Sequence, residues 1–355
     1  MSGPPPWLSR PARSRSRRPL LAALAGILVI AAVGGGIVAI VQAKGRPGHH
    51  HAAAAATRSI RSAPAEPPRS PAGLPLASPA FALAGAGSPH ADTLRVRFRT
   101  PPRAGLLFDL DSGRVLWQRN ATLRLPIASL TKMMTALLAV EADAPRTPVM
   151  VTRQALAANG SKVGLLPLGR HVSAEALLYG LLLPSGNDAA VALAQQTAGS
   201  VAAFVARMNA RAAQLGLGCT RFSSPHGFYD SGNFSCAADL AVLAHVVMAQ
   251  PRIARAARTL HAVVPFPIKG GKLYLNNNNP LLVLGYPGAI GLKTGYTEAA
   301  GRCLVAVAQR HGVRLGVVLL HSPATATQAR ALFDRAFRDV YHQRPVPEPA
   351  FPVGA

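Results

Sequence analysis

A serine and a lysine three residues apart could supply a nucleophile and its base. Ser129 and Lys132 open an apolar stretch that continues to Val140. If this stretch is helical, the spacing puts both side chains on one face, within reach of each other. A serine hydroxyl attacks well when a base removes its proton, and a buried lysine with a lowered pKa can be that base. The pattern alone also fits an ordinary helix cap beside a lysine that reaches solvent.

The chain uses lysine sparingly, since 6 of its 38 Lys and Arg residues are lysines. Arginine keeps its proton at any useful pH, so a lysine in a special position indicates chemistry that arginine cannot do. Lys293 is a second candidate, in a Lys-Thr-Gly motif that follows the apolar residues Ala289–Leu292. Its ammonium and the Thr294 hydroxyl could hold a carboxylate, and Gly295 would let an extended substrate approach the strand. An ordinary strand end is the alternative.

A third motif, Ser185-Gly186-Asn187, lies in a short loop between two expected helices. The same tripeptide recurs at Ser231-Gly232-Asn233, so it carries little information alone, and we interpret the second copy as a plain loop. The order S-x-x-K, S-x-N, K-T-G along one chain is far more specific than any member of the set.

Strand-like segments lie at both ends of the part of the chain that carries these motifs, and helical segments fill its middle. The early strands flank the turn Asp111-Ser112-Gly113, and the late strands flank Arg310-His311-Gly312. This order predicts an α/β (α+β) fold, in which an antiparallel sheet is built from both ends of the domain and helices pack on it. We expect strands at 105–109, 114–118, 303–309 and 313–321, and helices at 129–140, 174–183, 188–197, 202–215, 237–248 and 324–341.

Five stretches of the chain resemble one family, the serine D-alanyl-D-alanine carboxypeptidases among the low-molecular-weight penicillin-binding proteins. The three motifs are themselves typical of penicillin-binding proteins and class A β-lactamases. The resemblance covers about two thirds of the chain, from near residue 100 to near residue 340. The five stretches are residues 127–141, 177–194, 223–230, 276–282 and 291–307.

The resemblance implies an acyl-enzyme hydrolase with the DD-peptidase/β-lactamase-like fold. Ser129 would attack the bond between the two terminal D-alanines of a peptidoglycan stem peptide, Lys132 would take the serine proton, and Ser185 would relay a proton to the leaving D-alanine. A β-lactam such as penicillin would acylate Ser129 and leave slowly. We expect neither a metal nor a cofactor.

Further residues are expected to bind the substrate by the same resemblance. Asn187 would hydrogen-bond the substrate backbone, and Lys293, Thr294 and Gly295 would line the site of its terminal carboxylate. Tyr296 would supply one N–H of the oxyanion hole and Ser129 the other.

Three other functions fit the same motifs. A β-lactamase of class A would need a glutamate in a loop after the middle motif, and Glu175 instead precedes that motif inside an expected helix. A peptidoglycan endopeptidase would differ in the shape of its pocket, and a non-catalytic wall-binding protein would keep the fold without the activity. We expect His226 to be structural, Cys303 to be a buried strand residue, and Cys219 and Cys236 to be close enough in sequence for a disulfide.

The formal net charge of +24 raises nucleic acid as a partner. About half of the excess precedes residue 105, and the sequence has no basic stripe interleaved with aromatic residues, so we expect no nucleic-acid binding. The sequence does not indicate an oligomeric state.

The first hundred residues predict an exported chain. Residues 20–41 carry no charge and are long enough to cross a bilayer, and arginines precede them, so residues 1–19 would be cytoplasmic. This segment is expected to be an anchor, with a cleaved signal as the alternative. The expected order then continues with a disordered linker at 42–100, a catalytic domain at 101–343 and a disordered tail at 344–355.

Overall fold

The computed structural model describes residues 81–87, 92–228 and 232–345. The chain divides into two units, Met1–Ser62 and Ala63–Ala355, and every described residue belongs to the second. The expected segments 1–19 and 20–41 therefore lie outside the described residues. Among the helices that the structure describes, none is by itself long and apolar enough to cross a membrane. Helices α4 (Asn187–Ala198) and α5 (Val201–Gln214) are long and apolar enough only when taken together, and the chain bends by 83° between them.

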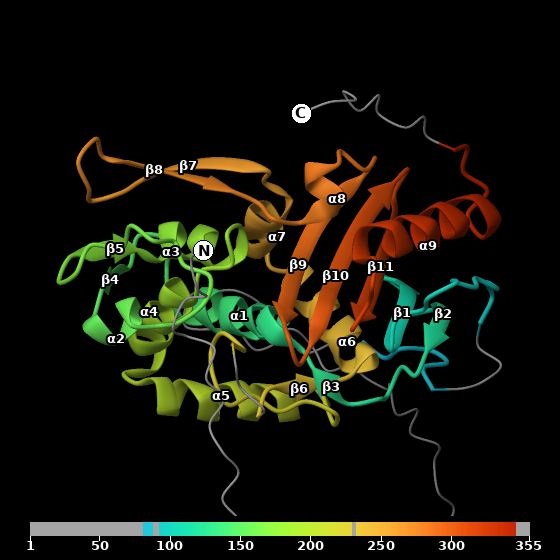
Figure 1. The fold of residues 1–355 in the computed structure, drawn as a ribbon, viewed down its shortest axis with the longest axis horizontal. Coiled ribbons are helices and arrows are strands. Elements are labelled where there is room, and N and C mark those ends of the chain that lie inside the picture. Colours follow the sequence, from blue (N-terminus) through green and yellow to red (C-terminus); the bar gives the residue numbers. More distant parts are fainter. Residues whose placement is uncertain (1–80, 88–91, 229–231, 346–355) are drawn as a thin grey trace, which may run out of the picture. The chain divides into compact units, whose positions relative to one another are not determined.

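A five-stranded antiparallel sheet joins the two ends of the described chain (Figure 1). The strand order is β2-β1-β11-β10-β9, so the first two strands complete a sheet begun by the last three. The expectation of an antiparallel sheet built from both ends of the domain is confirmed. The strands are β1 (Ala104–Asp109), β2 (Val115–Arg119), β9 (Ala289–Thr297), β10 (Gly301–Arg310) and β11 (Val313–Leu320).

Helices cover both faces of the sheet because the buried strands are apolar on both sides. Leu106 and Phe108 of β1 contribute to the core on the side of α1 and α6, whereas Leu107 between them contributes to the core beneath α9. The helices are α1 (Lys132–Ala142), α2 (Arg153–Leu156), α3 (Ala174–Leu182), α4 (Asn187–Ala198), α5 (Val201–Gln214), α6 (Ala237–Met248), α7 (Pro251–Arg258), α8 (Pro280–Val283) and α9 (Thr325–Asp339).

The long helices lie where the sequence predicts them, and the expected bounds of α6 agree with the structure at both ends. The expected helix from Ser129 instead begins with the 3₁₀ turn η1 (Ala128–Thr131), and α1 follows it. Short elements were not expected. They are α2, α7, α8 and three two-stranded ribbons: β3 (Leu125–Pro126) with β6 (Phe234–Ser235), β4 (Pro148–Met150) with β5 (His171–Ser173), and β7 (His261–Pro265) with β8 (Lys272–Asn276).

Part of the segment expected to be a disordered linker packs on the folded unit. Phe81 stacks on His245 of α6, with 3.8 Å between the ring centroids. The N–H of Ala84 donates to the carbonyl of Gly113 at 3.0 Å, and the Leu94 side chain is buried in the core beneath α9. The linker prediction for 42–100 is therefore wrong for these described residues, because apolar side chains scattered in an Ala- and Pro-rich segment still find partners on the sheet.

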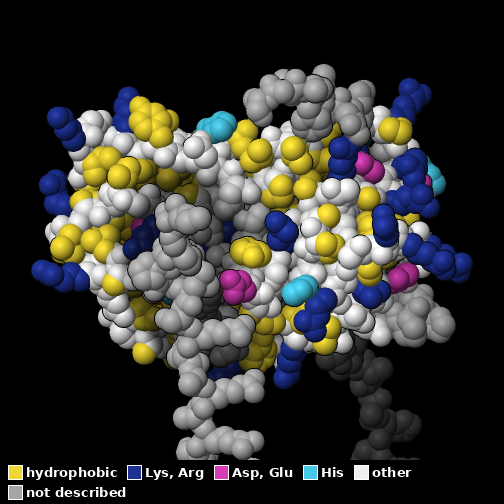
Figure 2. Space-filling view, viewed as in Figure 1, with side chains coloured by type: hydrophobic (Ala, Val, Ile, Leu, Met, Phe, Trp, Pro, Cys, Tyr) yellow, Lys and Arg dark blue, Asp and Glu magenta, His cyan; other side chains and the backbone are white. Residues whose placement is uncertain are grey.

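Basic side chains are dispersed over the face of the molecule seen in Figure 2, with few acidic side chains between them. They do not gather into one continuous stripe on this face. Several arginines in the described part of the chain form ion pairs, as Arg252 does with Glu175 and Arg335 with Asp339.

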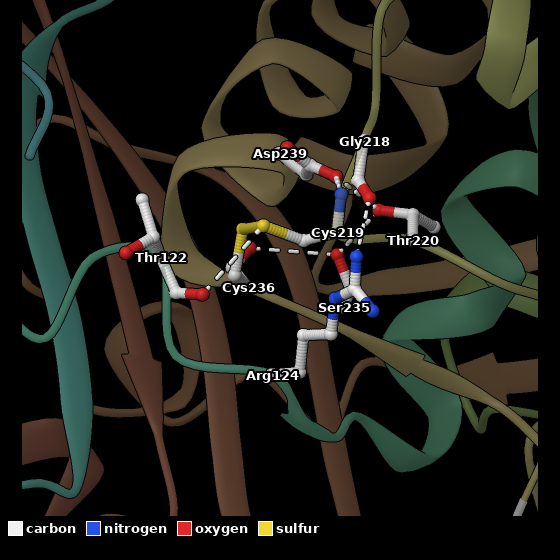
Figure 3. Close-up of a disulfide and its surroundings, with 8 residues drawn as sticks. All are labelled: Thr122, Arg124, Gly218, Cys219, Thr220, Ser235, Cys236 and Asp239. Carbon is white, nitrogen blue, oxygen red and sulfur yellow. Dashed lines mark hydrogen bonds between the residues drawn. A yellow bond between two sulfur atoms is a disulfide. The ribbon is translucent and has the colours of Figure 1, made fainter.

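A disulfide between Cys219 and Cys236 closes the loop that separates α5 from α6 (Figure 3). The two Cα atoms are 5.7 Å apart. Asp239, in the first turn of α6, reinforces this closure, because its Oδ2 accepts from the Cys219 N–H at 2.8 Å and from the Thr220 hydroxyl at 2.6 Å. The disulfide that the sequence suggested is thus present, and it fixes both ends of a loop whose middle approaches α1.

We predict that replacing Cys219 and Cys236 together by serine lowers the free energy of unfolding by about 2–4 kcal/mol, because the unfolded chain regains the entropy of an open 17-residue loop. Urea unfolding of the purified protein, followed by circular dichroism, measures this loss. Dithiothreitol should destabilise the wild type and leave the double variant unchanged. A wild type whose midpoint is insensitive to dithiothreitol would contradict the prediction.

Candidate active site

Ser129 and Lys132 lie on one side of the junction between η1 and α1. The distance from Lys132 Nζ to Ser129 Oγ is 2.7 Å, which is a hydrogen bond. Ser129 belongs to the 3₁₀ turn and Lys132 is the first residue of α1, so the spacing of three brings the side chains together as the sequence predicts. Lys132 is completely buried, and it is therefore not a lysine that reaches solvent.

Lys132 Nζ has two further neighbours, and both can act as acceptors towards it. Asn187 Oδ1 is 2.6 Å away and the backbone carbonyl of His226 is 3.3 Å away. The amide orientation of Asn187 is fixed from its other side, since its Nδ2 donates to the carbonyl of Asn159. A neutral amine has two N–H donors for these two oxygens, which leaves its lone pair for the Ser129 hydroxyl. The surroundings of Lys132 therefore suit a base.

Burial lowers the pKa of Lys132 well below its ordinary value, because a charged amine is costly away from water. The nearby ammonium of Lys293 lowers this pKa further, and the carboxylate of Asp188 opposes the change. Burial also lowers the pKa of Lys293, to about 7. Lys293 can thus lose its proton near neutral pH, and Lys132 loses its proton more readily than an exposed lysine does, whereas an arginine at either position would keep its charge.

Ser185 lies in the loop between α3 and α4, where Leu183-Pro184 ends the first helix and Asn187 begins the second. Its backbone has a φ of +66°, an uncommon value for a residue other than glycine, which is typical of functional sites. The Ser185 side chain is 3% exposed, and its Oγ has no hydrogen-bond partner among the described residues. A buried hydroxyl without a partner is available to a substrate.

Asp188, which follows the middle motif in the chain, ties the start of α4 to a neighbouring loop. Its Oδ1 accepts from the N–H of Val163 at 2.9 Å, and its Oδ2 accepts from the N–H of Gly164 at 3.2 Å. These bonds hold the loop that precedes β5 against the start of α4. Gly186 is required here, because a Cβ would lie 2.7 Å from Asp188 Oδ1.

The Lys-Thr-Gly motif lies on the edge strand β9, directly beside η1. A Cβ on Gly295 would lie 2.9 Å from the carbonyl oxygen of Ile127 and 3.2 Å from the backbone N of Ser129, so glycine allows the close approach. Lys293 is buried, and its Nζ donates to the carbonyl of Thr294 at 2.9 Å. The strand therefore brings one lysine beneath the site and leaves the Tyr296 side chain, which is 63% exposed, at its rim.

Five of the residues predicted from the sequence line one cavity of about 540 Å³, namely Ser129, Ser185, Thr294, Gly295 and Tyr296, whereas Lys132, Asn187 and Lys293 are not among its lining residues. Its lining includes the motif serines Ser129 and Ser185 and the end of β9. Among the described residues no carboxylate lines it. A second hollow, of about 680 Å³ beside β2, contains none of the motif residues. The residues lining the 540 Å³ cavity are Ser129, Gly160, Ser161, Ser185, Phe228, Asn278, Pro280, Thr294, Gly295, Tyr296, Arg302, Cys303 and Thr325.

Several residues of the cavity were not among the candidates from the sequence. Asn278 accepts from the Thr294 hydroxyl at 2.8 Å, and the run of four asparagines that contains it could have drawn attention to it. Phe228 and Arg302 line the cavity without a motif that would single them out. The sequence also gave no sign that the backbone carbonyl of His226, rather than its ring, would face Lys132.

The second Ser-Gly-Asn tripeptide has a different role. Ser231 lies outside the described residues, but Asn233 is buried, and its Nδ2 donates to Ser224 Oγ at 2.8 Å. Asn233 therefore supports the loop that presents the His226 carbonyl, and it does not line the cavity. Cys303 is buried in β10, as expected.

The glutamate considered for a β-lactamase lies elsewhere. Glu175 is in the first turn of α3, where its carboxylate pairs with Arg252 at 2.8 Å. It is not among the residues that line the cavity. Asp239, which does follow the middle motif, instead binds the disulfide loop (Figure 3).

Several proteins of similar sequence are D-alanyl-D-alanine carboxypeptidases. The D-alanyl-D-alanine carboxypeptidase family matches residues 100–324. D-alanyl-D-alanine carboxypeptidase DacB2 of Mycobacterium tuberculosis is 38% identical over 245 residues, which cover 67% of this chain and 82% of the relative. DacF of Bacillus subtilis is 36% identical over 217 residues, covering 60% of this chain and 55% of the relative, so the match spans about half of that protein.

Solved structures are similar as well. The D-alanyl-D-alanine carboxypeptidase from Mycobacterium tuberculosis matches with a TM-score of 0.65 and 34% identity, covering 74% of this chain and 98% of that one. The Streptomyces K15 DD-transpeptidase matches with a TM-score of 0.64 and 30% identity, covering 68% and 99%. The sequence motifs, the arrangement around Ser129 and these relatives lead to one conclusion: the chain belongs to the D-alanyl-D-alanine carboxypeptidase family.

Proposed function

We propose that this chain is a serine D-Ala-D-Ala carboxypeptidase that removes the terminal D-alanine from peptidoglycan stem peptides. The observation that carries the proposal is the completely buried Lys132, whose Nζ is 2.7 Å from Ser129 Oγ and has acceptors for both N–H bonds of a neutral amine. The names of the similar proteins support the same activity.

The reaction begins when Ser129 Oγ attacks the carbonyl of the penultimate D-alanine while Lys132 accepts the hydroxyl proton. The N–H groups of Ser129 and Tyr296 stabilise the oxyanion. Ser185, whose hydroxyl has no hydrogen-bond partner among the described residues, relays the proton from Lys132 to the amine of the leaving D-alanine as the C–N bond breaks, and this returns Lys132 to its neutral form. Water then attacks the ester, Lys132 takes its proton, and Ser129 is regenerated with the shortened peptide released.

Residues in and next to the same cavity would bind the substrate. Asn187 lies beside Lys132, where its amide can also bind the substrate backbone. Thr294 lines the cavity and would bind the terminal carboxylate, with the buried Lys293 next to it on β9, and the edge of β9 at Gly295 would offer hydrogen bonds to an extended peptide. A β-lactam would enter the same cavity and acylate Ser129.

The absence of a carboxylate from the described lining of the cavity favours this activity over a β-lactamase. A class A β-lactamase uses a glutamate to activate the water that releases penicillin. Without such a group the penicilloyl ester should persist, so penicillin should act as an inhibitor. An endopeptidase remains the alternative, since it would use the same catalytic residues on a cross-linked peptide.

We further propose that residues 20–41 anchor the chain in the cell membrane, with the catalytic unit on the outer side. The uncharged segment after five arginines supports an outward orientation. The Cys219–Cys236 disulfide also favours an oxidising compartment.

We predict that fluorescent penicillin labels the wild type stably and that Ser129→Ala abolishes both the labelling and the release of D-alanine. The reason is that no other nucleophile replaces the lost hydroxyl. Gel fluorescence over time and enzymatic detection of D-alanine from diacetyl-L-Lys-D-Ala-D-Ala provide the two measurements. Ser231→Ala, in the second Ser-Gly-Asn tripeptide, is the matched control and should keep both activities. A label that forms and disappears within seconds would identify a β-lactamase instead.

Acylation should speed up with rising pH, as Lys132 loses its proton and becomes a base. We predict that Lys293→Met moves the midpoint of this rise to higher pH, because the neighbouring ammonium that lowers the Lys132 pKa is removed. The measurement is the rate constant of penicillin acylation between pH 5 and 10. Lys132→Arg serves as the control and should be slow throughout, since it keeps the charge but provides no base. An unchanged midpoint in Lys293→Met would refute the coupling of the two lysines.

Protease treatment of spheroplasts that express the full chain tests its location. We predict that the chain sediments with the membranes and that external proteinase K degrades the catalytic unit. Deletion of residues 20–41 should keep the chain inside, protected from the protease. Protection of the intact full-length chain in sealed spheroplasts would contradict the proposed orientation.

A further inference from the structure

The five-stranded sheet has two edges, and the cavity that contains Ser129 adjoins only one of them. That edge is β9, whereas β2 forms the opposite edge of the sheet (Figure 1). Four inter-strand spacings of about 4.8 Å separate the two strands, so the edges lie roughly 19 Å apart. The hollow of about 680 Å³ lies at the β2 edge, away from the catalytic residues.

The segment before β1 forms one wall of this hollow with side chains that alternate in burial. Leu94 is buried, and its N–H donates to the carbonyl of Leu116 in β2 at 3.0 Å. Phe98 is half-buried, whereas Arg95 and Arg97 are exposed. Successive side chains of an extended chain point to opposite sides. The apolar residues therefore hold the segment on the sheet and leave both arginines in solvent.

The charge of the hollow is positive and is not neutralised by the folded unit. Its lining contains Arg95, Arg97 and Arg119, but Asp92 as its only acidic residue among those described. The Asp92 carboxylate accepts hydrogen bonds from Gln118. In the described part of the chain, no acidic residue forms an ion pair with any of the three arginines. They are therefore available to an anion from outside.

The β2 edge is also where the described chain first meets the sheet. The Gln118 side chain of β2 donates to the carbonyl of Gly85 at 3.2 Å, so residues 81–87 as well as 92–98 pack beside this strand. Both stretches follow the proposed anchor at 20–41 in the chain. With that anchor in the membrane, contact between this edge and the membrane is intramolecular, so that even weak binding is populated.

Anionic phospholipids have the chemistry that this surface fits. A guanidinium binds a phosphate group through two parallel hydrogen bonds and keeps its charge at physiological pH. Basic residues close to a membrane anchor are attracted to anionic lipids, at about fivefold in affinity for each residue. A phosphate-rich wall polymer could meet the same arginines, but its binding would gain nothing from the anchor.

We propose that Arg95, Arg97 and Arg119 bind the phosphate groups of anionic phospholipids and hold the β2 edge against the membrane in which the chain is anchored. The cavity at β9 then faces away from the membrane, towards the wall peptides. The inference rests on the proposed anchor and goes beyond the proposed reaction, since none of the three arginines lines the catalytic cavity.

Trp117 lines the hollow and serves as the probe of this contact. The chain has two tryptophans, so Trp7→Phe leaves Trp117 as the only one that emits. The full-length Trp7→Phe protein is reconstituted into vesicles of phosphatidylcholine, with or without phosphatidylglycerol, that contain a headgroup spin-labelled lipid as quencher. Quenching should be stronger with phosphatidylglycerol, and about 1 M NaCl should remove the difference, because salt screens the charges.

Arg95→Gln/Arg97→Gln should lower the ratio of docked to undocked protein by about 25-fold, at about fivefold for each arginine, and reduce quenching to that in neutral vesicles. Arg255→Gln/Arg258→Gln is the matched control, because it removes the same charge from exposed positions of α7, which packs on β9. This control should be quenched like its parent. Fluorescent penicillin should label both double variants, which shows that they are folded.

Equal quenching in the two kinds of vesicle would overturn the inference, as would unchanged quenching in Arg95→Gln/Arg97→Gln. A response of Trp117 to soluble poly(glycerol phosphate), with none to phosphatidylglycerol, would assign the arginines to a wall polymer instead. Flotation of the full chain with anionic vesicles alone would overturn the proposed anchor while supporting the inference. A parent protein that penicillin does not label would overturn the proposed reaction and leave the quenching comparison intact, so these failures are distinguishable.

Discussion

The site depends on the burial of two amines within one small volume. Lys132 is completely buried and Lys293 is 1% exposed, and the charge of Lys293 contributes to the lowered pKa of Lys132. Water would normally solvate these groups, so the protein must supply acceptors in its place. Lys132 receives acceptors from Asn187 and the His226 carbonyl and a third hydrogen-bond partner from Ser129, and the three lie on different segments. Any segment that moved away would leave a buried donor unsatisfied.

Much of the surrounding structure serves to bring these segments close together. Gly227 has a φ of +76°, and a Cβ there would clash with the carbonyl oxygen of Ala128, so glycine lets the middle of the disulfide loop rest directly on η1. The Thr135 hydroxyl binds the carbonyl of Pro225 at 2.6 Å and ties the same loop to α1. The disulfide and Asp239 close the loop at its ends. Stability and chemistry therefore depend on the same contacts.

The edge strand β9 connects the catalytic groups with the substrate side. Its inner residues contribute Lys293 beneath the site, and its close approach to Ser129 at Gly295 leaves an open edge along which a peptide can lie. The neighbouring strand β10 and the first turn of α9 contribute Arg302 and Thr325 to the lining of the same cavity.

The sequence by itself determined the features that depend on residues near one another. Helical periodicity located α6 within its observed bounds, and a spacing of three placed Ser129 beside Lys132, because local backbone geometry fixes such distances. The alternation of strands and helices also indicated a sheet built from both ends. Only the tertiary structure decided that Asn187, 55 residues away, and His226, 94 residues away, would complete the surroundings of Lys132. It also decided that Arg302 would face the cavity and that residues 81–87 would join the folded unit. Burial and long-range contact arise from the packing of whole elements, and no local pattern of side chains encodes them.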